Sequence, residues 1–576
     1  MPTRQPFDLA HWRSKLQSHP SKEFAEYILD GVQNGFPIGH AGETPTGATR
    51  NHPVEEVSKV NSITDWLFKG VDNGYILGPF AEHEVPVKNL IVSPLGQVPK
   101  DKHNPADPRV RPIHDLSAPK QREGRPTTGL SVNDSLQRPM CTATYVWFVE
   151  IVRLANEVGK DGYLWVIDAA DAYLRVPVRE EDWWLLGICW FDQYFIMTCL
   201  PFGLASAPKI YTAFADAIEW MTICSDFQLF MSDQGVQLIR HYLDDFFGGS
   251  PDKAMALRQF ETVEKAMRDA AIPTRASKME PPAHGQKIIG TFFDTHTQTI
   301  TLPEDKCVRY AQHIREICDS SSNNYTPRPT KKRLQKLVGE LRFAARHIWC
   351  GKANVRDLEI LKDSLEFDFE HTRVRKDIRM RLMWFIHVLE ALQVGISFEF
   401  ILHPRKACQW RSTTDAFVNS REAGVGGYNC QGDWYQCRVD IQKEFGSAKA
   451  PDINWFELVA IVIAIRLWSH YWRSSSVLLE SDNSPSVHQL HKQSCTRERL
   501  DILRLILHAT DISVRDEFHF WTVHLPGVKN KVADALSRFE PDPFGSLDAQ
   551  QRATIKDKPC EATEIMSELL NLYRNV

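Results

Sequence analysis

The chain has 576 residues, of which 43% are apolar and 24% are charged, and its formal net charge is −5. That length predicts several domains and excludes a single small module, and the composition is typical of ordinary globular proteins with buried cores. The small negative charge excludes any argument for a nucleic-acid partner from overall charge, so such a partner must be inferred from local patches.

Cysteine usage and apolar runs indicate the compartment. The 12 cysteines are scattered, with no C-x-x-C pair and no His/Cys cluster at zinc spacing, which indicates reduced thiols in an intracellular protein. Residues 1–30 lack the apolar core of a secretory signal, and the apolar run Leu458 to Ile465 is too short to cross a bilayer. We therefore expect a soluble protein of the cytoplasm, the nucleus or both, with no membrane partner.

Residues 1–80 are predicted to form a leader without evident chemistry. One segment, Phe24 to Val32, has a helical pattern, and Gly39 to Pro53 is a polar passage rich in Gly, Pro and Thr. The sequence indicates no role for this leader.

Residues 81–300 contain two acidic strand ends. The run Arg240 to Gly249 has apolar residues on both sides of Asp244 and Asp245, which predicts two short strands meeting at a tight acidic turn. Taken alone, such a turn is more often a surface feature of a hairpin. A buried-type strand, Trp165 to Asp168, also ends in an acid. Its carboxylate, brought beside the turn, would complete a site for two Mg²⁺ ions, because carboxylates are the hard oxygen ligands that Mg²⁺ requires.

Residues 301–407 begin a basic helical region. The segment Lys331 to Ile348 has apolar residues at helical spacing, at Leu334, Leu337, Val338, Leu341 and Phe343. Residues 321–360 hold nine Lys or Arg against three acids. The pattern predicts a helix whose basic face follows phosphates, with an ordinary solvated face as the alternative.

Residues 408–540 contain a second series of acids. Asp415 lies beside a Gly-rich hairpin signal, Gly424 to Gly427, and Glu457 begins an apolar helix. Asp482 ends a strand, and Asp534 follows in a long run that begins at His524. Each acid is a weak signal by itself, and their order supports the set.

Residues 541–576 read as a linker followed by a short helix, Glu561 to Tyr573, of unknown role.

These motifs together resemble the reverse transcriptase and RNase H of LTR-like retrotransposons, most closely those of DIRS-type (tyrosine-recombinase) elements. The polymerase motifs that carry the resemblance occur in the family's order over about 85 to 300. They are Val98 to Lys100, Arg111 to Ser117, Ser131 to Asp134, Asp182-Trp183, Leu186-Gly187, Leu200 to Pro208 and Tyr242 to Asp245. The nuclease resemblance covers about 408 to 540.

The resemblance implies an α/β (α+β) fold, a right-hand polymerase followed by an RNase H-like α/β domain. Its parts would be fingers and palm at 81–300, thumb and connection at 301–407, and the nuclease at 408–540. It implies two Mg²⁺ ions per active site, with Mn²⁺ as an alternative. The implied partners are an RNA template, a DNA primer, RNA–DNA hybrid and dNTPs, and they extend to other proteins of the element. The oligomeric state stays open.

The resemblance also implies roles for polymerase residues. Asp168, Asp244 and Asp245 would bind the catalytic metals. Tyr173 would be the steric gate against ribonucleotides, although a core aromatic is the commoner reading of such a residue. The remaining residues would bind substrate, with exposed charge as the alternative for the basic ones: Lys100 and Arg111 on the triphosphate, Phe202 and Gly203 in the nucleotide-positioning loop, and Lys278 as general acid toward pyrophosphate.

In the nuclease part, Asp415, Glu457, Asp482 and Asp534 would bind two metals that activate water. His524 would assist near the phosphate or in product release, with an ordinary loop histidine as the alternative.

Two other functions remain open. The chain could be a host-retained nucleic-acid-binding protein that has lost one or both activities, although every expected carboxylate is present. It could also be chiefly a hybrid-cleaving nuclease whose polymerase half only holds the duplex.

Overall fold

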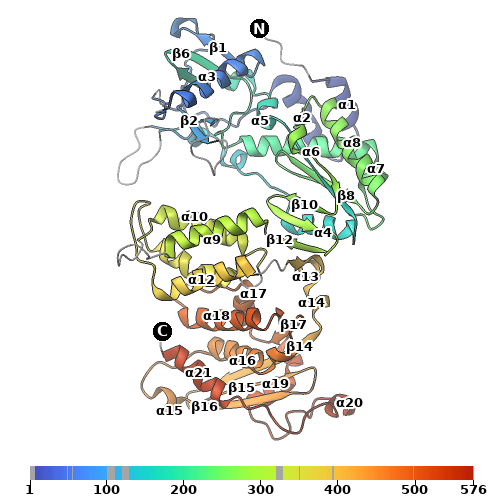
Figure 1. Ribbon diagram of the computed structural model, residues 1–576, viewed down its shortest axis with the longest axis vertical. Coiled ribbons are helices and arrows are strands. Elements are labelled where there is room, and N and C mark those ends of the chain that lie inside the picture. Colours follow the sequence, from blue (N-terminus) through green and yellow to red (C-terminus); the bar gives the residue numbers. More distant parts are fainter. Residues whose placement is uncertain are drawn as a thin grey trace. The chain divides into compact units, whose positions relative to one another are not determined.

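The computed structural model describes residues 7–47, 50–54, 56–99, 110–119, 129–318, 328–348, 351–391, 395–496 and 498–574. The chain divides into two compact units, Met1–Gln298 and Thr299–Val576, which are treated separately below (Figure 1).

The N-terminal residues of unit 1 form three helices where the sequence predicted one. These are α1 (Leu9–Leu16), α2 (Lys22–Asn34) and α3 (Val57–Asp72). The first two begin at side-chain caps, because Asp8 accepts from the His11 amide and Ser21 from the Phe24 amide. Trp12 and Ile28 are fully buried in the same core as helix α6 (Ala207–Ser225), and Figure 1 shows α1 and α2 beside it. The described part of the predicted leader is therefore built into the core of unit 1.

The main sheet of unit 1 has the strand order β7-β8-β4-β9. The strands are β7 (Ile239–Tyr242), β8 (Asp245–Ser250), β4 (Tyr163–Asp168) and β9 (Glu280–Ala283). Helix α8 (Lys253–Asp269) packs on β4 and β8. Strand β4 is buried over its last five residues, as expected from an apolar run of this length. The predicted strand and hairpin are both confirmed.

Smaller sheets surround it. One has the order β1-β6-β5, from β1 (Ile76–Phe80), β6 (Gln193–Met197) and β5 (Gly187–Trp190). Another is the antiparallel pair β2 (Leu95–Pro99) and β3 (Val110–His114). An antiparallel hairpin is formed by β10 (Gly285–Ile288) and β11 (Thr291–Asp294).

Unit 2 begins with a helical layer around its own core. The helices are α9 (Glu304–Cys318), α10 (Lys331–Ala344), α11 (Gly351–Asp363) and α12 (Lys376–Ala391). Helix α10 buries Leu334, Leu337, Val338 and Leu341, as the apolar spacing predicted. Its exposed residues include Lys332, Arg333 and Lys336.

The rest of unit 2 is a five-stranded sheet in the order β16-β15-β14-β17-β18. The strands are β14 (Trp410–Val418), β15 (Glu422–Asn429), β16 (Trp434–Asp440), β17 (Ser476–Ser481) and β18 (His519–His524). The first three pair antiparallel, and β17 and β18 run parallel to β14. Helices α16 (Ile453–Trp468) and α19 (Lys531–Ser537) both pack on β14 and β15.

Helix α16 is the most apolar of the described helices. With the turn after it, Ile453–Tyr471 is the one described helix long and apolar enough to cross a membrane by length and composition, but 72% of its most apolar window is buried. Its side chains, such as Phe456 and Ile461, lie in the core of the α/β domain. We therefore assign it as a core helix.

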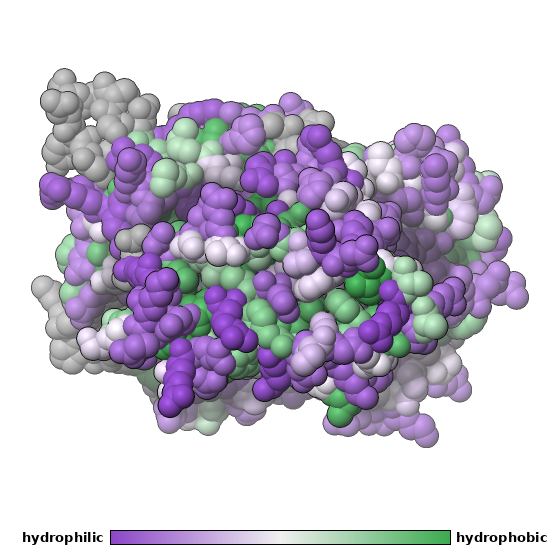
Figure 2. Space-filling model, turned by 90° about the horizontal axis from the view of Figure 1, so that it is seen from below, coloured by the Kyte–Doolittle hydropathy of each residue, from purple (hydrophilic) through white to green (hydrophobic). Residues whose placement is uncertain are grey.

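The described residues near the C-terminus pack against the α/β domain. Helix α21 (Thr563–Arg574), close to its predicted position, packs on α16 and on α18 (Leu500–Arg515) and buries Met566, Leu569 and Leu570. Before it, Lys556 pairs with Asp433. Figure 2 shows the end of the molecule at the foot of Figure 1 as mostly hydrophilic, with apolar groups between the charged ones.

The predicted α/β class is confirmed, because the described strands form several sheets that are packed against helices.

Candidate active sites

The β7–β8 hairpin brings three aspartates to one end of the main sheet of unit 1. Tyr242 pairs with Asp245 across the turn, and the residue after Tyr242, Leu243, takes a left-handed backbone with φ of 51°. Asp245 in turn pairs with Asp168 at the end of β4. The Ala169 amide donates to the Asp244 carbonyl over 2.8 Å, which ties the turn to the neighbouring strand end.

The negative charges of this cluster are only partly balanced by cations of the described residues. Burial, followed by repulsion from Asp244 and Asp168, raises the pKa of Asp245 to about 6, and burial also raises the pKa of Asp244. Among the described residues, the one cation in direct contact with these acids is Lys278, whose Nζ lies 2.6 Å from Asp168 Oδ1. Asp168 Oδ2 is buried and has no hydrogen-bond partner among the described residues. An orphaned carboxylate oxygen in an acidic cluster fits a divalent cation.

The loop 200–208 is fixed tightly beside this cluster. Gly203 has φ of 120°, and a Cβ there would lie 1.9 Å from the His114 carbonyl oxygen, so only glycine fits. The His114 amide donates to the Phe202 carbonyl over 3.0 Å. Asn133 donates to the Gly203 carbonyl over 2.9 Å and accepts from the Ala205 amide over 2.8 Å. The sequence indicated Asn133 only as part of the motif Ser131 to Asp134. Its hydrogen bonds show that it positions the loop.

Two predicted substrate-binding side chains contact Phe202. The Tyr173 ring centroid is 5.2 Å from the Phe202 ring centroid, and the Arg111 guanidinium carbon is 5.6 Å from it. The Tyr173 ring also packs 5.4 Å from Tyr211, and burial raises its pKa. Arg111 is exposed on β3. Lys100, the other predicted triphosphate ligand, lies outside the described residues.

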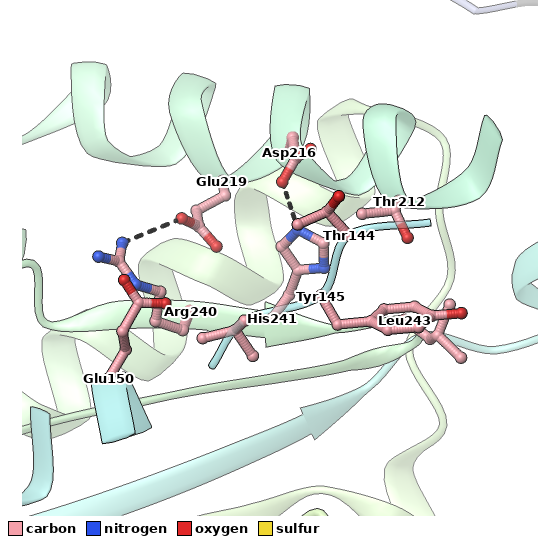
Figure 3. A pocket seen from close by; sticks show the side chains of 10 residues that line it. Thr144, Tyr145, Glu150, Thr212, Asp216, Glu219, Arg240, His241 and Leu243 are labelled. Atoms are coloured by element: carbon pink, nitrogen blue, oxygen red, sulfur yellow. Dashed lines mark hydrogen bonds and ion pairs between the residues drawn. The ribbon is translucent and has the colours of Figure 1, made fainter. Parts of the chain in front are cut away.

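A polar pocket of about 200 Å³ lies behind the hairpin (Figure 3). Asp216 and Glu219 project from α6 toward β7, where His241 Nε2 lies 2.9 Å from Asp216 Oδ1 and Arg240 lies 3.4 Å from Glu219. Burial raises the pKa of Glu219. These two ion pairs attach the strand that leads into the acidic turn to the long helix behind it.

The α/β domain of unit 2 gathers a second acidic cluster. Asp415 in β14, Glu457 in α16 and Asp482 after β17 each offer a carboxylate oxygen, and these oxygens all lie within 4.8 Å of one another. Asp534, the fourth predicted ligand, is not in that group: it pairs with Arg538 over 2.6 Å and is half-exposed. The structure thus brings three of the four acids together and leaves the fourth beside them on α19.

Burial and mutual repulsion dominate the electrostatics of this cluster. Burial, with the charges of Asp482 and Asp534 adding to it, raises the pKa of Asp415 to about 7. Burial and the neighbouring charges of Asp415 and Asp482 raise the pKa of Glu457 to about 9. Carboxyl groups this close cannot all ionise unless a cation joins them, so the cluster fits a divalent metal ion.

Glycines in β15 allow α19 to approach this cluster. The expected hairpin is formed by β14 and β15, and Gly424, Gly426 and Gly427 lie within its second strand. A Cβ on Gly424 would lie 2.2 Å from the Ser537 carbonyl oxygen, and one on Gly426 would lie 2.6 Å from Leu536 Cβ. The missing side chains let α19 lie directly on the strand.

His524 lies at the end of β18, exposed beside the second cluster. Its Nε2 is 3.0 Å from the backbone carbonyl oxygen of Asp482. This contact holds the imidazole next to one of the clustered acids without bonding the carboxylate itself.

Comparisons with known proteins give a partial match. No family model matches the chain. It is 22% identical to the Pro-Pol polyprotein of simian foamy virus type 3 (strain LK3) over 195 residues, which cover 34% of this chain and 15% of that one. The Pro-Pol polyprotein of feline foamy virus is 21% identical over 189 residues, which cover 33% of this chain and 14% of that one.

Two solved structures are similar at low identity. A foamy viral protease-reverse transcriptase in complex with RNA/DNA hybrid matches with a TM-score of 0.47 and 14% identity, covering 90% of this chain and 63% of that one. A foamy viral protease-reverse transcriptase described as dRH, in complex with double-stranded DNA, matches with a TM-score of 0.46 and 15% identity, covering 91% of this chain and 84% of that one. The similarity in sequence supports a relation to foamy viral Pro-Pol polyproteins over about a third of the chain (34%), and does not support the narrower placement among DIRS-type elements.

Proposed function

We propose that this chain is an RNA-directed DNA polymerase of a mobile element and carries an RNase H that degrades the RNA strand of RNA–DNA hybrids. The observation that carries the proposal is the convergence of Asp168, Asp244 and Asp245 at one end of a sheet, beside a rigid loop that contains Phe202 and Gly203. The placement among DIRS-type elements is a narrower part of the proposal and rests on motifs such as Ser131 to Asp134.

Each acidic cluster would hold two divalent ions, Mg²⁺ or Mn²⁺. Ions bound there would neutralise phosphate charge and activate the attacking oxygen, a primer 3′-hydroxyl at Asp168, Asp244 and Asp245 and a water molecule at the second cluster. The carboxylates of Asp415, Glu457 and Asp482 would form that second site. Asp534 would join them when it parts from Arg538, and His524 would act beside the phosphate.

The polymerase side chains would select and orient a dNTP. Arg111 presents an exposed guanidinium that can donate to two phosphate oxygens at once. The Tyr173 ring, packed between Phe202 and Tyr211, is held firmly enough to exclude a ribose 2′-hydroxyl. Lys278 would donate a proton from Nζ to the leaving pyrophosphate once it leaves Asp168. Lys100 would add a second cation on the triphosphate.

The nucleic-acid partners would be an RNA template, a DNA primer and their hybrid. The exposed Lys332, Arg333 and Lys336 on α10 would contact phosphates, which gives little sequence preference and strong salt dependence. The protein would act inside the cell, in the cytoplasm or nucleus, alongside other proteins of the element.

Primer extension tests the polymerase proposal. The purified chain should extend oligo(dT) on poly(rA) with Mg²⁺, and the double variant Asp244→Asn/Asp245→Asn should not. If neither extends while both still cleave a labelled hybrid, the chain is chiefly a nuclease. If both activities are absent from folded protein that binds the duplex, it is a retained binding protein.

A further inference from the structure

Three residues of α19 face the second acidic cluster together. Asn530, Asp534 and Ser537 are spaced by four and three residues, which places them on one face of the helix. Asp534 is a proposed metal ligand, and the other two have no role in the mechanism described above. Both nonetheless bond directly to the buried Asp415.

Neutral donors occupy both carboxylate oxygens of Asp415. Asn530 Nδ2 donates to Asp415 Oδ1 over 3.1 Å, and the Ser537 hydroxyl donates to Asp415 Oδ2 over 2.7 Å. Asn530 Nδ2 also donates to the Thr414 carbonyl over 3.2 Å. Both residues are almost completely buried, Asn530 at 1% and Ser537 at 0% exposure. Asp415 is therefore fixed in orientation by two side chains from the same helix.

Asn530 makes these bonds instead of the usual N-cap hydrogen bond. It stands at the N-cap of α19, where an asparagine side chain usually accepts a hydrogen bond from the first turn, yet here it makes no capping bond. Its amide is turned toward β14 instead. A side chain that forgoes a cap worth about 1 kcal/mol in favour of an acid in a metal cluster is positioned for the site rather than for the helix.

The chemistry of the donors suits a metal ligand. An amide and a hydroxyl orient the carboxylate without neutralising it, and each oxygen keeps a lone pair for a cation. The polymerase cluster differs, because there the Lys278 ammonium bonds Asp168 directly. Groups that orient metal ligands in this way typically change metal affinity or activity by about 10- to 100-fold when removed.

We propose that Asn530 and Ser537 are positioning residues of the nuclease site, which hold the Asp415 carboxylate in the orientation that binds the divalent ions. The inference rests on the proposed nuclease function. It assigns a task to two residues that touch neither substrate nor metal.

The test measures metal binding apart from activity. The full chain with Asp244→Asn/Asp245→Asn, which silences the polymerase cluster, is titrated with Mn²⁺, and free Mn²⁺ is followed by electron paramagnetic resonance. Ser537→Ala should weaken Mn²⁺ binding by about 10-fold or more. Asn530→Ala removes the amide that donates to Asp415 Oδ1 without adding charge, and should likewise weaken binding. Ser537→Thr keeps the hydroxyl and should restore most of the affinity.

Ser513→Ala is the matched control. Ser513 is 1% exposed, and its hydroxyl donates to the Phe518 carbonyl over 2.5 Å, away from the acidic cluster. Both Ser→Ala changes remove one buried hydroxyl, so both should lower the melting temperature to a similar degree. Only Ser537→Ala should reduce Mn²⁺ affinity and the kcat of hybrid cleavage, with KM for the hybrid unchanged.

The outcomes separate the two claims. Mn²⁺ affinity and kcat in Ser537→Ala equal to those of Ser513→Ala would overturn the positioning role. A parent chain that binds Mn²⁺, loses affinity in Ser537→Ala and cleaves no hybrid would leave the positioning role standing and refute the nuclease function.

Discussion

Replacing Gly426 by alanine should impair the nuclease site through the position of α19. The added Cβ would lie 2.6 Å from both Leu536 Cβ and the Ser537 amide nitrogen. Carbon atoms pack at about 3.5 to 4.0 Å, so the helix must retreat by about 1 Å. Asp534 and Ser537 would move with it. A displacement of about 1 Å can cost about 100-fold in rate, and we expect hybrid cleavage to fall by about 10- to 100-fold.

The assay compares two activities of one preparation. Cleavage of a labelled RNA–DNA hybrid should fall in Gly426→Ala, while primer extension, whose proposed catalytic residues lie in unit 1, should persist. Gly339→Ala is the matched control, because a Cβ on that α10 glycine meets nothing within 4 Å. Overpacking at Gly426 should also destabilise the α/β domain by about 1 to 3 kcal/mol. A folded Gly426→Ala variant that cleaves hybrid at the wild-type rate would refute the argument that the glycines set the distance of α19.

Three further predictions follow from the same geometry. Without metal, the α/β domain should lose stability as pH rises from about 5 to 8, because Asp415 and Glu457 keep protons in the folded state that they release on unfolding. The free energy of unfolding should fall by about 1.4 kcal/mol per pH unit for each retained proton. Denaturant unfolding measured with Mg²⁺ in place of EDTA should show a weaker dependence on pH. Gly203→Ala would force a Cβ against the His114 carbonyl and should abolish primer extension while hybrid cleavage continues, and normal extension would contradict this. Removing residues 561–576 would take away the three buried apolar side chains of α21 and uncover the surfaces of α16 and α18 that they cover. It should destabilise the α/β domain by about 5 kcal/mol, measured by thermal unfolding, and an unchanged melting temperature would show that the helix is dispensable.

The local patterns of the acidic hairpin and of α10 could be predicted from the sequence, because they depend on neighbouring residues. Apolar residues on both sides of Asp244 and Asp245 specify two strands and a turn. Apolar spacing specifies the buried face of α10. The pairing of Asp168 with Asp245 followed from motif order rather than from any local signal.

Contacts between distant segments could not be predicted in this way. The bond from Lys278 to Asp168 joins residues 110 positions apart. The glycines of β15 indicated a hairpin, and only the position of α19 shows that Gly424 and Gly426 also make room for a helix. The leader likewise gave one helical signal, because its other two helices depend on distant contacts: α1 packs on α6, and α3 packs on β1 and β3.

The central claim is that one chain holds two separate metal-dependent sites for synthesis and for cleavage. The most direct measurement follows extension and RNA cleavage on one doubly labelled template–primer, with wild type, Asp244→Asn/Asp245→Asn and Asp415→Asn. We expect both activities in the wild type, cleavage alone in the first variant and extension alone in the second. Loss of both activities in either variant, with the protein still folded, would contradict two independent sites.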